Sequence, residues 1–491
     1  MSSAAAPRAQ PIHFYPPQST LQFGIRAIAG RFNRARWWSI GITQMLFFGL
    51  CWAQWQGRPL VSFDLVRQQV HLFGGLFGPQ DLLLLTLLLI GGALALFVTS
   101  AVGGRIFCGF VCPQSVYTAL FIWIEQRVQG TPGQRQRRQA SGAPVVIAAL
   151  WARRLLTWAL WATVSLALGW TLTAYFSSAP ALWQRTWQGQ LGGAESTLML
   201  GYAAFALAQA GFLREKVCQH MCPYARFQGV MATPQTQSVV YDVPRGEPRR
   251  STAHSVANAA AQTAAVRASV PAASTAQPPS RGDCLDCNLC VEVCPAGIDI
   301  RNGLQYECIS CGLCIDACDR VMDKARQPQG LIRFASQQGA DWRHTLRQRR
   351  VRVYFVLLGL TALAVVATVA WRVPLQVEVV RDRGVMARQL RNGDVENIYR
   401  VHIQNYDTQA HAYRIALAGD TPLRMPPQEP VVIASGEERT VAVAVVQPYR
   451  STSGADPGRG VSTITPIALQ VQSLVDAQQQ RTRSSSFIQP R

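Results

Sequence analysis

Lysine is nearly absent from this 491-residue chain, which contains only Lys216 and Lys324. The net charge of +20 therefore comes almost entirely from arginine. A strongly basic chain can bind nucleic acid, but such proteins also show a recognisable binding motif. This sequence has none, and its arginines recur beside apolar segments, as they do at the cytoplasmic ends of membrane helices. We therefore expect no nucleic-acid partner.

A signal peptide is also missing. The first 36 residues are polar and contain no short apolar core followed by a small-residue cleavage site. A secretory signal needs both features. We expect residues 1–36 to be a retained cytoplasmic tail.

Long apolar segments recur through much of the chain. About twenty apolar residues are enough for a helix to cross the hydrocarbon core of a bilayer. Five segments approach or reach that length: 37–56, 82–102, 155–176, 198–213 and 353–371. Residues 115–124 are too few to cross, so we expect them at the membrane interface. The sequence predicts a multi-domain membrane protein whose α-helical bundle has about five spans, four within 37–242 and the fifth within 343–371.

Arginine is distributed unevenly between the connections. The tail, the loop 127–154 and the segment 343–352 are rich in arginine, whereas 57–80 and 177–195 are poor in it. Arginine-rich loops tend to stay in the cytoplasm. This rule places the N-terminus and the segment between the fourth and fifth spans in the cytoplasm, and the C-terminus on the other side.

Eight of the thirteen cysteines form two successive C-x2-C-x2-C-x3-C runs between residues 284 and 318. This spacing is typical of bacterial two-cluster ferredoxins, in which the fourth thiolate of each run binds the other cluster. One [4Fe-4S] cluster is assigned to Cys284, Cys287, Cys290 and Cys318, and the other to Cys308, Cys311, Cys314 and Cys294. Zinc sites use separated C-x2-C pairs and disulfide frameworks belong to small secreted domains, so neither explains the pattern. Residues 282–342 are predicted to form a two-cluster, ferredoxin-like α+β domain.

Two C-x3-C-P motifs follow the second and fourth spans, from Cys108 to Pro113 and from Cys218 to Pro223. Both spans run toward the cytoplasm, so the two cysteine pairs are expected at the same depth and close together. The residue before a proline avoids helical geometry. We therefore predict a turn at each motif, with the proline opening the next helix.

These motifs predict a metal or redox site. The thiolates of Cys108, Cys112, Cys218 and Cys222, together with His220, are a soft ligand set of the kind that selects Cu(I). We predict one copper site shared by the four thiolates. A copper ion held by Cys218, His220 and Cys222 alone, a structural zinc site and packed structural thiols are the alternatives. Cys51, within the first span, is expected to be a small apolar residue.

The rest of the chain divides into a tether and a β domain. Residues 243–281 are dominated by Ala, Ser, Pro, Gln and Thr and lack the periodicity of a core, which predicts a flexible linker. Residues 372–491 alternate apolar and polar residues with period two, as at Tyr399, Val401 and Ile403. Such runs, separated by turn residues, predict an antiparallel β-sandwich.

Taken together, these motifs resemble the CcoG/RdxA/FixG family of membrane polyferredoxins, which are accessory proteins for the assembly of cbb3-type cytochrome c oxidase. The similar segments are Phe107 to Pro113, Cys218 to Tyr224, both ferredoxin runs and Arg381-Asp382-Arg383. The resemblance implies a cupric reductase that converts Cu(II) to Cu(I) for the oxidase, with the four membrane cysteines as the copper site. It also implies that the C-terminal β domain is immunoglobulin-like.

The same resemblance implies a multi-pass protein of the bacterial inner membrane, with a cytoplasmic ferredoxin domain and a periplasmic C-terminal domain. Oxidase assembly factors and copper carriers are the implied partners, and a homodimer is compatible with the sequence. Two other functions fit the motifs: a quinol-linked electron-transfer subunit that feeds a soluble reductase, and a non-enzymatic copper-delivery scaffold. The electron donor is unknown, because glycine pairs such as Gly91-Gly92 lack the strand-to-helix context of a dinucleotide site.

The arginine asymmetry generates a prediction about topology. Reporter fusions made after Asp341 should behave as cytoplasmic, and fusions made after Arg400 should behave as external. Paired activities of a cytoplasmic and a periplasmic reporter measure this directly. The reverse pattern would place the cluster cysteines on the oxidising side and contradict the assignment.

Overall fold

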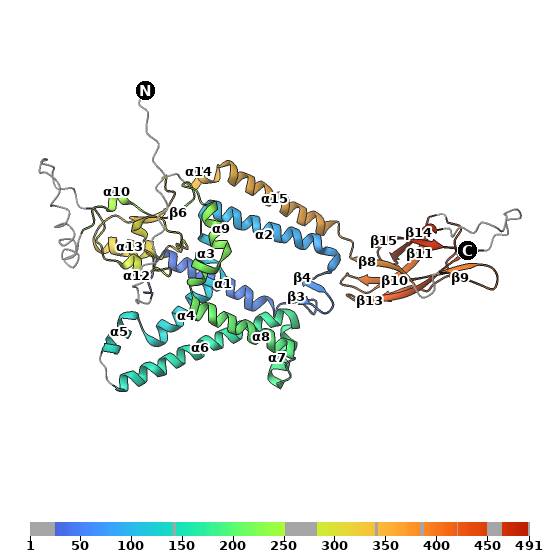
Figure 1. The fold of residues 1–491 in the computed structure, drawn as a ribbon, viewed down its shortest axis with the longest axis horizontal. Coiled ribbons are helices and arrows are strands. Elements are labelled where there is room, and N and C mark those ends of the chain that lie inside the picture. Colours follow the sequence, from blue (N-terminus) through green and yellow to red (C-terminus); the bar gives the residue numbers. More distant parts are fainter. Residues whose placement is uncertain are drawn as a thin grey trace, which may run out of the picture. The chain divides into compact units, whose positions relative to one another are not determined.

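The computed structural model describes residues 25–140, 144–250, 282–338, 342–382, 387–419, 421–448 and 464–489. Most of the predicted tail, the predicted linker from residue 251 onward, and Arg383 lie outside these residues. The chain forms two compact units (Figure 1). The first comprises Met1–Gly49, Leu89–Thr173 and Arg185–Ala362, and the second comprises Leu50–Leu88, Ala174–Gln184 and Leu363–Arg491.

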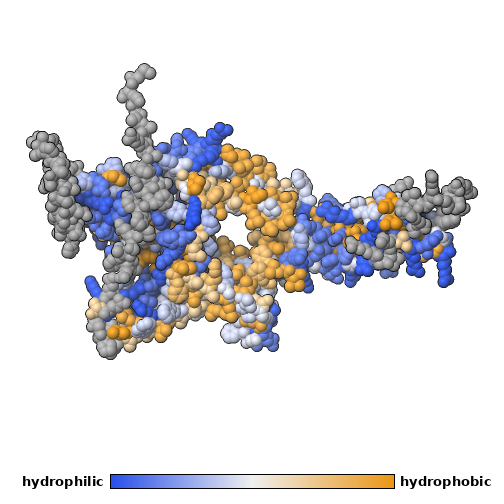
Figure 2. Space-filling model, in the orientation of Figure 1, coloured by the Kyte–Doolittle hydropathy of each residue, from blue (hydrophilic) through white to orange (hydrophobic). Residues whose placement is uncertain are grey.

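Long apolar helices dominate the part of the chain before residue 371. They are α1 (Arg31–Leu50), α2 (Leu82–Gly103), α4 (Pro113–Gln129), α6 (Pro144–Ser177), α8 (Gly193–Ala206) and α15 (Arg349–Ala370). Shorter helices are α3 (Ile106–Phe110), α5 (Pro132–Ala140), α7 (Ala179–Gln188) and α9 (Pro223–Met231). Figure 2 shows apolar residues at the surface of the helical region, and Leu89 of α2, Trp151 of α6 and Leu363 of α15 are exposed among the described residues.

Five helical stretches of the described residues are long and apolar enough to cross a membrane: Pro79–Gly103, Ile106–Arg135, Ile147–Ser177, Gly193–Leu213 and Arg349–Ala370. The chain is therefore a multi-pass membrane protein. Four of the five stretches coincide with predicted spans. The helix α1 is not among the five, because Arg31, Arg34 and Arg36 occupy its first turns.

The predicted first span differs from α1 at its end. The helix stops at Leu50 instead of continuing to residue 56. Residues Gln54–Trp55 form the strand β1, which pairs antiparallel with β2 (Arg58–Pro59). The prediction was wrong there because apolar composition alone does not distinguish the end of a helix from a short hairpin.

The contacts of α4 bear on whether its stretch crosses the membrane. Arg36 Nη2 donates a hydrogen bond to the carbonyl of Ser115 at 3.3 Å, near the start of α4. Gln126 Nε2 donates to the carbonyl of Ile25 at 2.6 Å, near its end. Trp123, near the end of α4, also packs against Trp37, so α4 lies along the first half of α1. Residues 115–124 belong to the stretch Ile106–Arg135, which is long enough to cross a membrane. The expectation that they are too few to cross was therefore wrong, and their place at the interface stays a prediction.

The ferredoxin fold begins earlier than predicted. Its sheet pairs β6 (Ser238–Tyr241) with β7 (Ile332–Ala335), and β6 lies within the predicted membrane domain 37–242. The helix α10 (Val243–Gly246) and Arg250, placed in the predicted linker, also pack here, since the Arg250 N–H donates to the carbonyl of Cys284 at 2.7 Å. Between the strands lie α12 (Leu289–Glu292) and α13 (Leu313–Lys324). The sheet was not predicted, because its two strands are short and the cysteine runs separate them in the sequence.

The start of α1 is capped by the ferredoxin fold. The carboxylate of Asp316 accepts hydrogen bonds from the backbone N–H groups of Phe32 at 3.2 Å and Asn33 at 2.8 Å. Such N–H groups have no partner within their own helix, and a carboxylate also favours the positive end of the helix dipole. A Cβ atom at Gly30 would lie 2.2 Å from Asp316 Cγ, so only glycine fits there.

The second unit contains the predicted β-sandwich. One antiparallel sheet consists of β8 (Leu375–Arg381), β9 (Arg388–Gln389), β10 (Val395–Asn405) and β13 (Glu438–Gln447). The other consists of β11 (His411–Ala418), β12 (Val431–Ile433), β14 (Ile464–Ser473) and β15 (Gln480–Ile488). The predicted inward residues Tyr399, Val401 and Ile403 are fully buried in the core between the sheets. A smaller sheet of β3 (Val61–Asp64), β4 (Gln69–Leu72) and β5 (Gly75–Phe77) belongs to the same unit.

The contact between Gly30 and Asp316 generates a stability prediction. Gly30→Ala should destabilise the protein by about 1–3 kcal/mol, because the new methyl group overpacks the site. Thermal unfolding of the purified protein measures the effect. Gly41→Ala on the same helix is the control, since a Cβ there meets no atom within 4 Å. Equal unfolding temperatures for the two variants would contradict the contact.

Candidate functional site

The eight ferredoxin cysteines surround two cavities of the first unit. One cavity is lined by Cys284, Cys287, Cys290 and Cys318. The other is lined by Cys294, Cys308, Cys311 and Cys314, and Cys290 lines it as well. Each cavity thus receives three thiols from one run and the fourth from the other run. This is the spatial grouping that the cysteine spacing predicts.

These thiols are buried, and burial changes their chemistry. Burial raises the pKa of Cys318 to about 12, and the neighbouring Cys290 and Cys284 add to the increase. Burial likewise raises the pKa of Cys290 to about 12. Such thiols stay protonated at neutral pH unless a metal ion replaces the proton.

The spread of the thiols fits a cluster better than a single ion. Among the described residues, no three His, Cys, Asp or Glu side chains converge closely enough to hold one ion. In a [4Fe-4S] cluster each thiolate binds a different iron atom, so the four sulfur atoms must stand apart. Four thiols around each cavity meet that requirement. A tetrahedral zinc ion would need them to converge.

The two cysteine runs fold in the same way. In each run, the residues before and after the second cysteine have a positive φ: Asp286 (53°) and Asn288 (57°), then Ser310 (52°) and Gly312 (75°). This left-handed conformation is unusual for residues other than glycine, asparagine and aspartate. It turns the chain sharply twice, so that three thiols of one run face one cavity.

The two C-x3-C-P motifs also share one backbone conformation. The N–H of Cys112 donates to the carbonyl of Phe107 at 2.9 Å, and the N–H of Cys222 donates to the carbonyl of Val217 at 2.8 Å. Each second cysteine is then the N-cap of a helix whose first residue is the proline, α4 in one case and α9 in the other. The predicted turn, with proline opening the next helix, is confirmed.

The four membrane cysteines lie in one neighbourhood. Cys108 lies close enough to Cys112 and Cys222 for charges on these side chains to interact if they ionise. Cys218 lies equally within reach of Cys108, Cys112 and Cys222. The Cys108 thiol donates a hydrogen bond to Gln228 Oε1 at 3.3 Å. The structure thus brings both pairs together at the end of the helical bundle.

This group of thiols packs directly against a ferredoxin run. A Cβ atom at Gly109 would lie 2.7 Å from the carbonyl oxygen of Ile309 and 2.9 Å from Cys311 Cα. Cys108, Ile309 and Cys311 belong to the same buried cluster. Only glycine allows so close an approach of two backbones. The motif and the second cluster cavity are therefore neighbours.

His220 lies at the surface, between the two cysteines of the second C-x3-C-P motif. His220 and Met221 are both exposed, with 65% of the Met221 side chain accessible. They lie in the π-helical turn Val217–Met221, and such a turn changes the direction in which each side chain points. His220 belongs to no group of three ligating side chains in the described residues. The structure leaves His220 exposed, and its role as a metal ligand stays a prediction.

Two polar residues of the site were not predicted. Gln228 of α9 is 2% exposed and contacts the Cys108 thiol. Arg105 donates to the carbonyls of Tyr306 at 2.6 Å and Ala225 at 2.5 Å. Arg105 thereby joins the start of α3 to α9 and to the ferredoxin loop. In the sequence Arg105 is one of many arginines beside an apolar span, so no pattern indicated that it belongs to the site.

Comparisons with known proteins agree with this organisation. Residues 213–337 match a 4Fe-4S dicluster domain, residues 85–132 match a 4Fe-4S binding domain, and residues 365–490 match the IG-like fold at the C-terminal of FixG. Protein RdxB of Cereibacter sphaeroides is 31% identical over 92% of this chain and 93% of its own length. Protein RdxA of the same organism is 31% identical over 90% of this chain and 92% of its own. Nitrogen fixation protein FixG of Rhizobium meliloti is 29% identical over 85% of this chain and 82% of its own.

The Gly109 contact generates a spectroscopic prediction. Gly109→Ala should shift the EPR signal of the cluster assigned to Cys308, Cys311 and Cys314, because the methyl group displaces the backbone at Cys311. The signal of the other cluster should not change. The matched control is Gly92→Ala in α2, where a Cβ meets no atom within 4 Å. Identical spectra for Gly109→Ala and the parent protein, at full iron content, would contradict the packing.

Proposed function

The chain belongs to the RdxA/FixG/CcoG family of iron-sulfur membrane proteins, and from that membership we propose that it reduces Cu(II) to Cu(I) for the assembly of a cbb3-type cytochrome c oxidase. In this proposal Cys108, Cys112, Cys218 and Cys222 bind the copper ion. The eight ferredoxin cysteines would hold the clusters that supply the electrons.

The observation that supports this proposal best is the contact at Gly109. A ferredoxin run and a C-x3-C motif meet backbone to backbone, with Cys108 and Cys311 in one buried cluster. A thiol site at that position can exchange electrons with its neighbour without any movement of the chain. A copper-delivery scaffold would have no need for this proximity.

The chemistry of the residues is compatible with the reaction. When bound, a [4Fe-4S] cluster supplies one electron at a time, which is what the reduction of one Cu(II) requires. Thiolates stabilise the Cu(I) product, because soft ligands prefer the soft ion. The Cys108 thiol must release its proton to bind a metal, and Gln228, which accepts its hydrogen bond, holds the side chain in the site.

The proposal includes an orientation and partners. The arginines of the connections support a cytoplasmic ferredoxin domain and a periplasmic β-sandwich in the bacterial inner membrane. Copper carriers and oxidase assembly factors would then deliver copper and remove it. A homodimer is compatible with this arrangement.

A second candidate concerns the same four cysteines. Residues 85–132, which include Cys108 and Cys112, match a 4Fe-4S binding domain. This match favours a third iron-sulfur cluster at this position, which would make the protein an electron-transfer subunit.

Single cysteine variants test the proposal. Cys108→Ser and Cys218→Ser should each lower the rate of Cu(I) formation by about tenfold or more, and the double variant should lose little more, because groups acting as one unit are not additive. The rate is measured with dithionite-reduced protein, Cu(II) and a Cu(I)-specific chelator. Cys51→Ser is the control, since Cys51 is a buried cysteine of the second unit and belongs to neither C-x3-C-P motif.

Iron content separates the two candidates. With a copper site, Cys108→Ser, Cys218→Ser and the double variant should keep the iron content of the parent protein. With a third cluster, Cys108→Ser and Cys218→Ser should lose about four iron atoms per chain. Undiminished Cu(I) formation in a variant lacking all four membrane cysteines would remove them from the reaction.

A further inference from the structure

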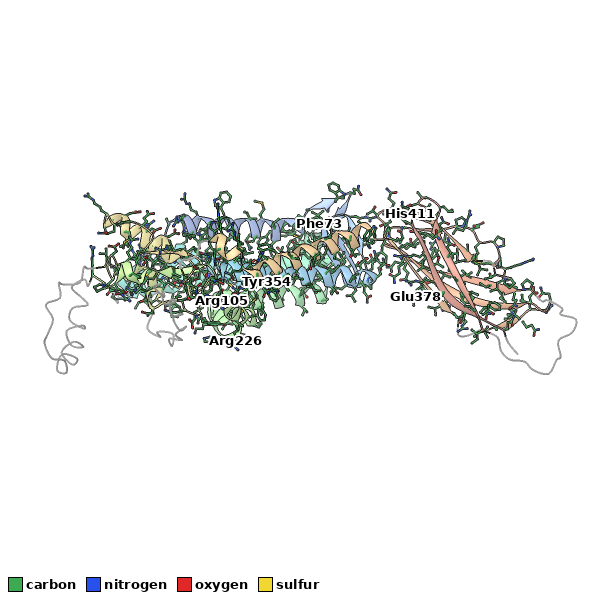
Figure 3. The ribbon with its side chains drawn as sticks, turned by 90° about the horizontal axis from the view of Figure 1, so that it is seen from above. Phe73, Arg105, Arg226, Tyr354, Glu378 and His411 are labelled. Atoms are coloured by element: carbon green, nitrogen blue, oxygen red, sulfur yellow. The ribbon has the colours of Figure 1, made fainter. Side chains whose placement is uncertain are left out.

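A cavity of about 570 Å³ lies in the first unit, beside the ferredoxin loop 304–310. Pockets for small organic ligands typically have about 300–1,000 Å³. Its lining includes Arg105, Arg226, Val230, Ser238, Tyr306 and Cys308. Figure 3 labels the two arginines, which lie in the same part of the first unit. Gln228, which accepts the hydrogen bond of the Cys108 thiol, also lines this cavity, but the copper reaction proposed above places no reactant in it.

We propose that this cavity binds the ring of a membrane quinone, and that the quinol form is the electron donor of the protein. The inference rests on the proposed function, because it identifies the reductant that copper reduction needs. A quinone has a flat apolar ring with two oxygen atoms and a tail that stays in the bilayer. Its site must open toward the membrane, offer hydrogen-bond partners and lie next to an electron acceptor.

The cavity lies where a ligand can enter from the bilayer. Val230 of α9 lines it and is 87% exposed, so an apolar side chain stands at the opening. One helical turn earlier, the ring of Phe227 stacks on Phe97 of α2 with the centroids 5.4 Å apart. Phe97 also contacts Tyr354 of α15. Both α2 and α15 belong to stretches that can cross the membrane, so α9 lies at the ends of the spans.

The cavity offers polar partners for the two oxygen atoms. Ser238 lines it and is 6% exposed, and its hydroxyl makes no hydrogen bond within the described residues. A buried hydroxyl without a partner is costly, and a carbonyl oxygen of the ring would satisfy it. The guanidinium group of Arg226 can donate to the second oxygen. Within the described part of the chain, it donates a hydrogen bond of 3.3 Å to the carbonyl of His220.

Contacts of Arg105 hold one wall of the cavity in place. The guanidinium carbon of Arg105 lies 4.6 Å from the centre of the Tyr306 ring. The same arginine donates to the carbonyls of Tyr306 and Ala225. These contacts fix the loop relative to α9, so the cavity is preformed and a ligand need not open it.

The electron acceptor lies at the wall. Cys308 lines both this cavity and the cavity assigned to the second cluster. Oxidation of one quinol to the quinone releases two electrons and two protons. The two clusters accept one electron each and can then reduce two Cu(II) ions. The protons pass to water beside Arg226, which is exposed at the surface.

Photolabelling tests the site without relying on activity. The full-length protein is placed in phospholipid nanodiscs and illuminated with an azido-ubiquinone. Labelled peptides should come from α9, from the start of β6 or from loop 304–310, and decylubiquinone should compete for the label. Val230→Trp should reduce labelling about tenfold, because the larger side chain closes the opening. Ser238→Ala should weaken the competition by decylubiquinone about fivefold, the value of one hydrogen bond.

The control variant is Val356→Trp, the same substitution at an exposed position of α15 that does not line the cavity, and its labelling should not change. Labelling elsewhere, labelling unaffected by Val230→Trp, or competition by phospholipid but not by decylubiquinone would overturn the proposal. The two proposals fail separately. Dithionite-reduced protein that reduces Cu(II) but is not labelled refutes only the quinone site, and labelled protein that cannot reduce Cu(II) refutes only the copper function.

Discussion

A contact that admits no side chain holds the membrane cysteines against the ferredoxin fold. At Gly109 the backbone of a C-x3-C motif approaches Ile309 and Cys311 so closely that a methyl group would have to displace one of them. The eight ferredoxin cysteines and the four membrane cysteines therefore occupy one continuous region of the first unit. Electron transfer in the proposed reaction depends on this proximity, because neither group of cysteines alone connects an electron donor to a metal substrate.

Two charged side chains hold the elements of this region together through hydrogen bonds. Asp316 caps the start of α1, and Arg105 joins the start of α3 to α9 and to the ferredoxin loop. Asp316 accepts hydrogen bonds from backbone N–H groups, and Arg105 donates hydrogen bonds to backbone carbonyls. These backbone groups lie at helix ends and loops and would otherwise lack partners. The elements that carry the thiols are thereby fixed, while the cavities between them stay open.

Structural features that follow from a regular residue spacing could be predicted from the sequence. The cysteine spacing gave the grouping of thiols around two cavities, and alternation gave the buried face at Tyr399, Val401 and Ile403. Other features depend on contacts that no local pattern encodes. The strands β6 and β7 are four residues each and lie on either side of the cysteine runs, so their pairing was missed. Adjacency to cysteine in the sequence suggested His220 as a ligand, but a π-helical turn leaves it exposed.

Rapid freeze-quench EPR of the reduced protein mixed with Cu(II) tests the central claim most directly. Both the reduced clusters and Cu(II) are paramagnetic, so one experiment follows donor and acceptor together. If the clusters reduce copper through the adjacent thiols, the Cu(II) signal and the reduced-cluster signal should disappear at the same rate, with one Cu(II) lost for each cluster oxidised. A Cu(II) signal that persists while the clusters stay reduced would contradict the account.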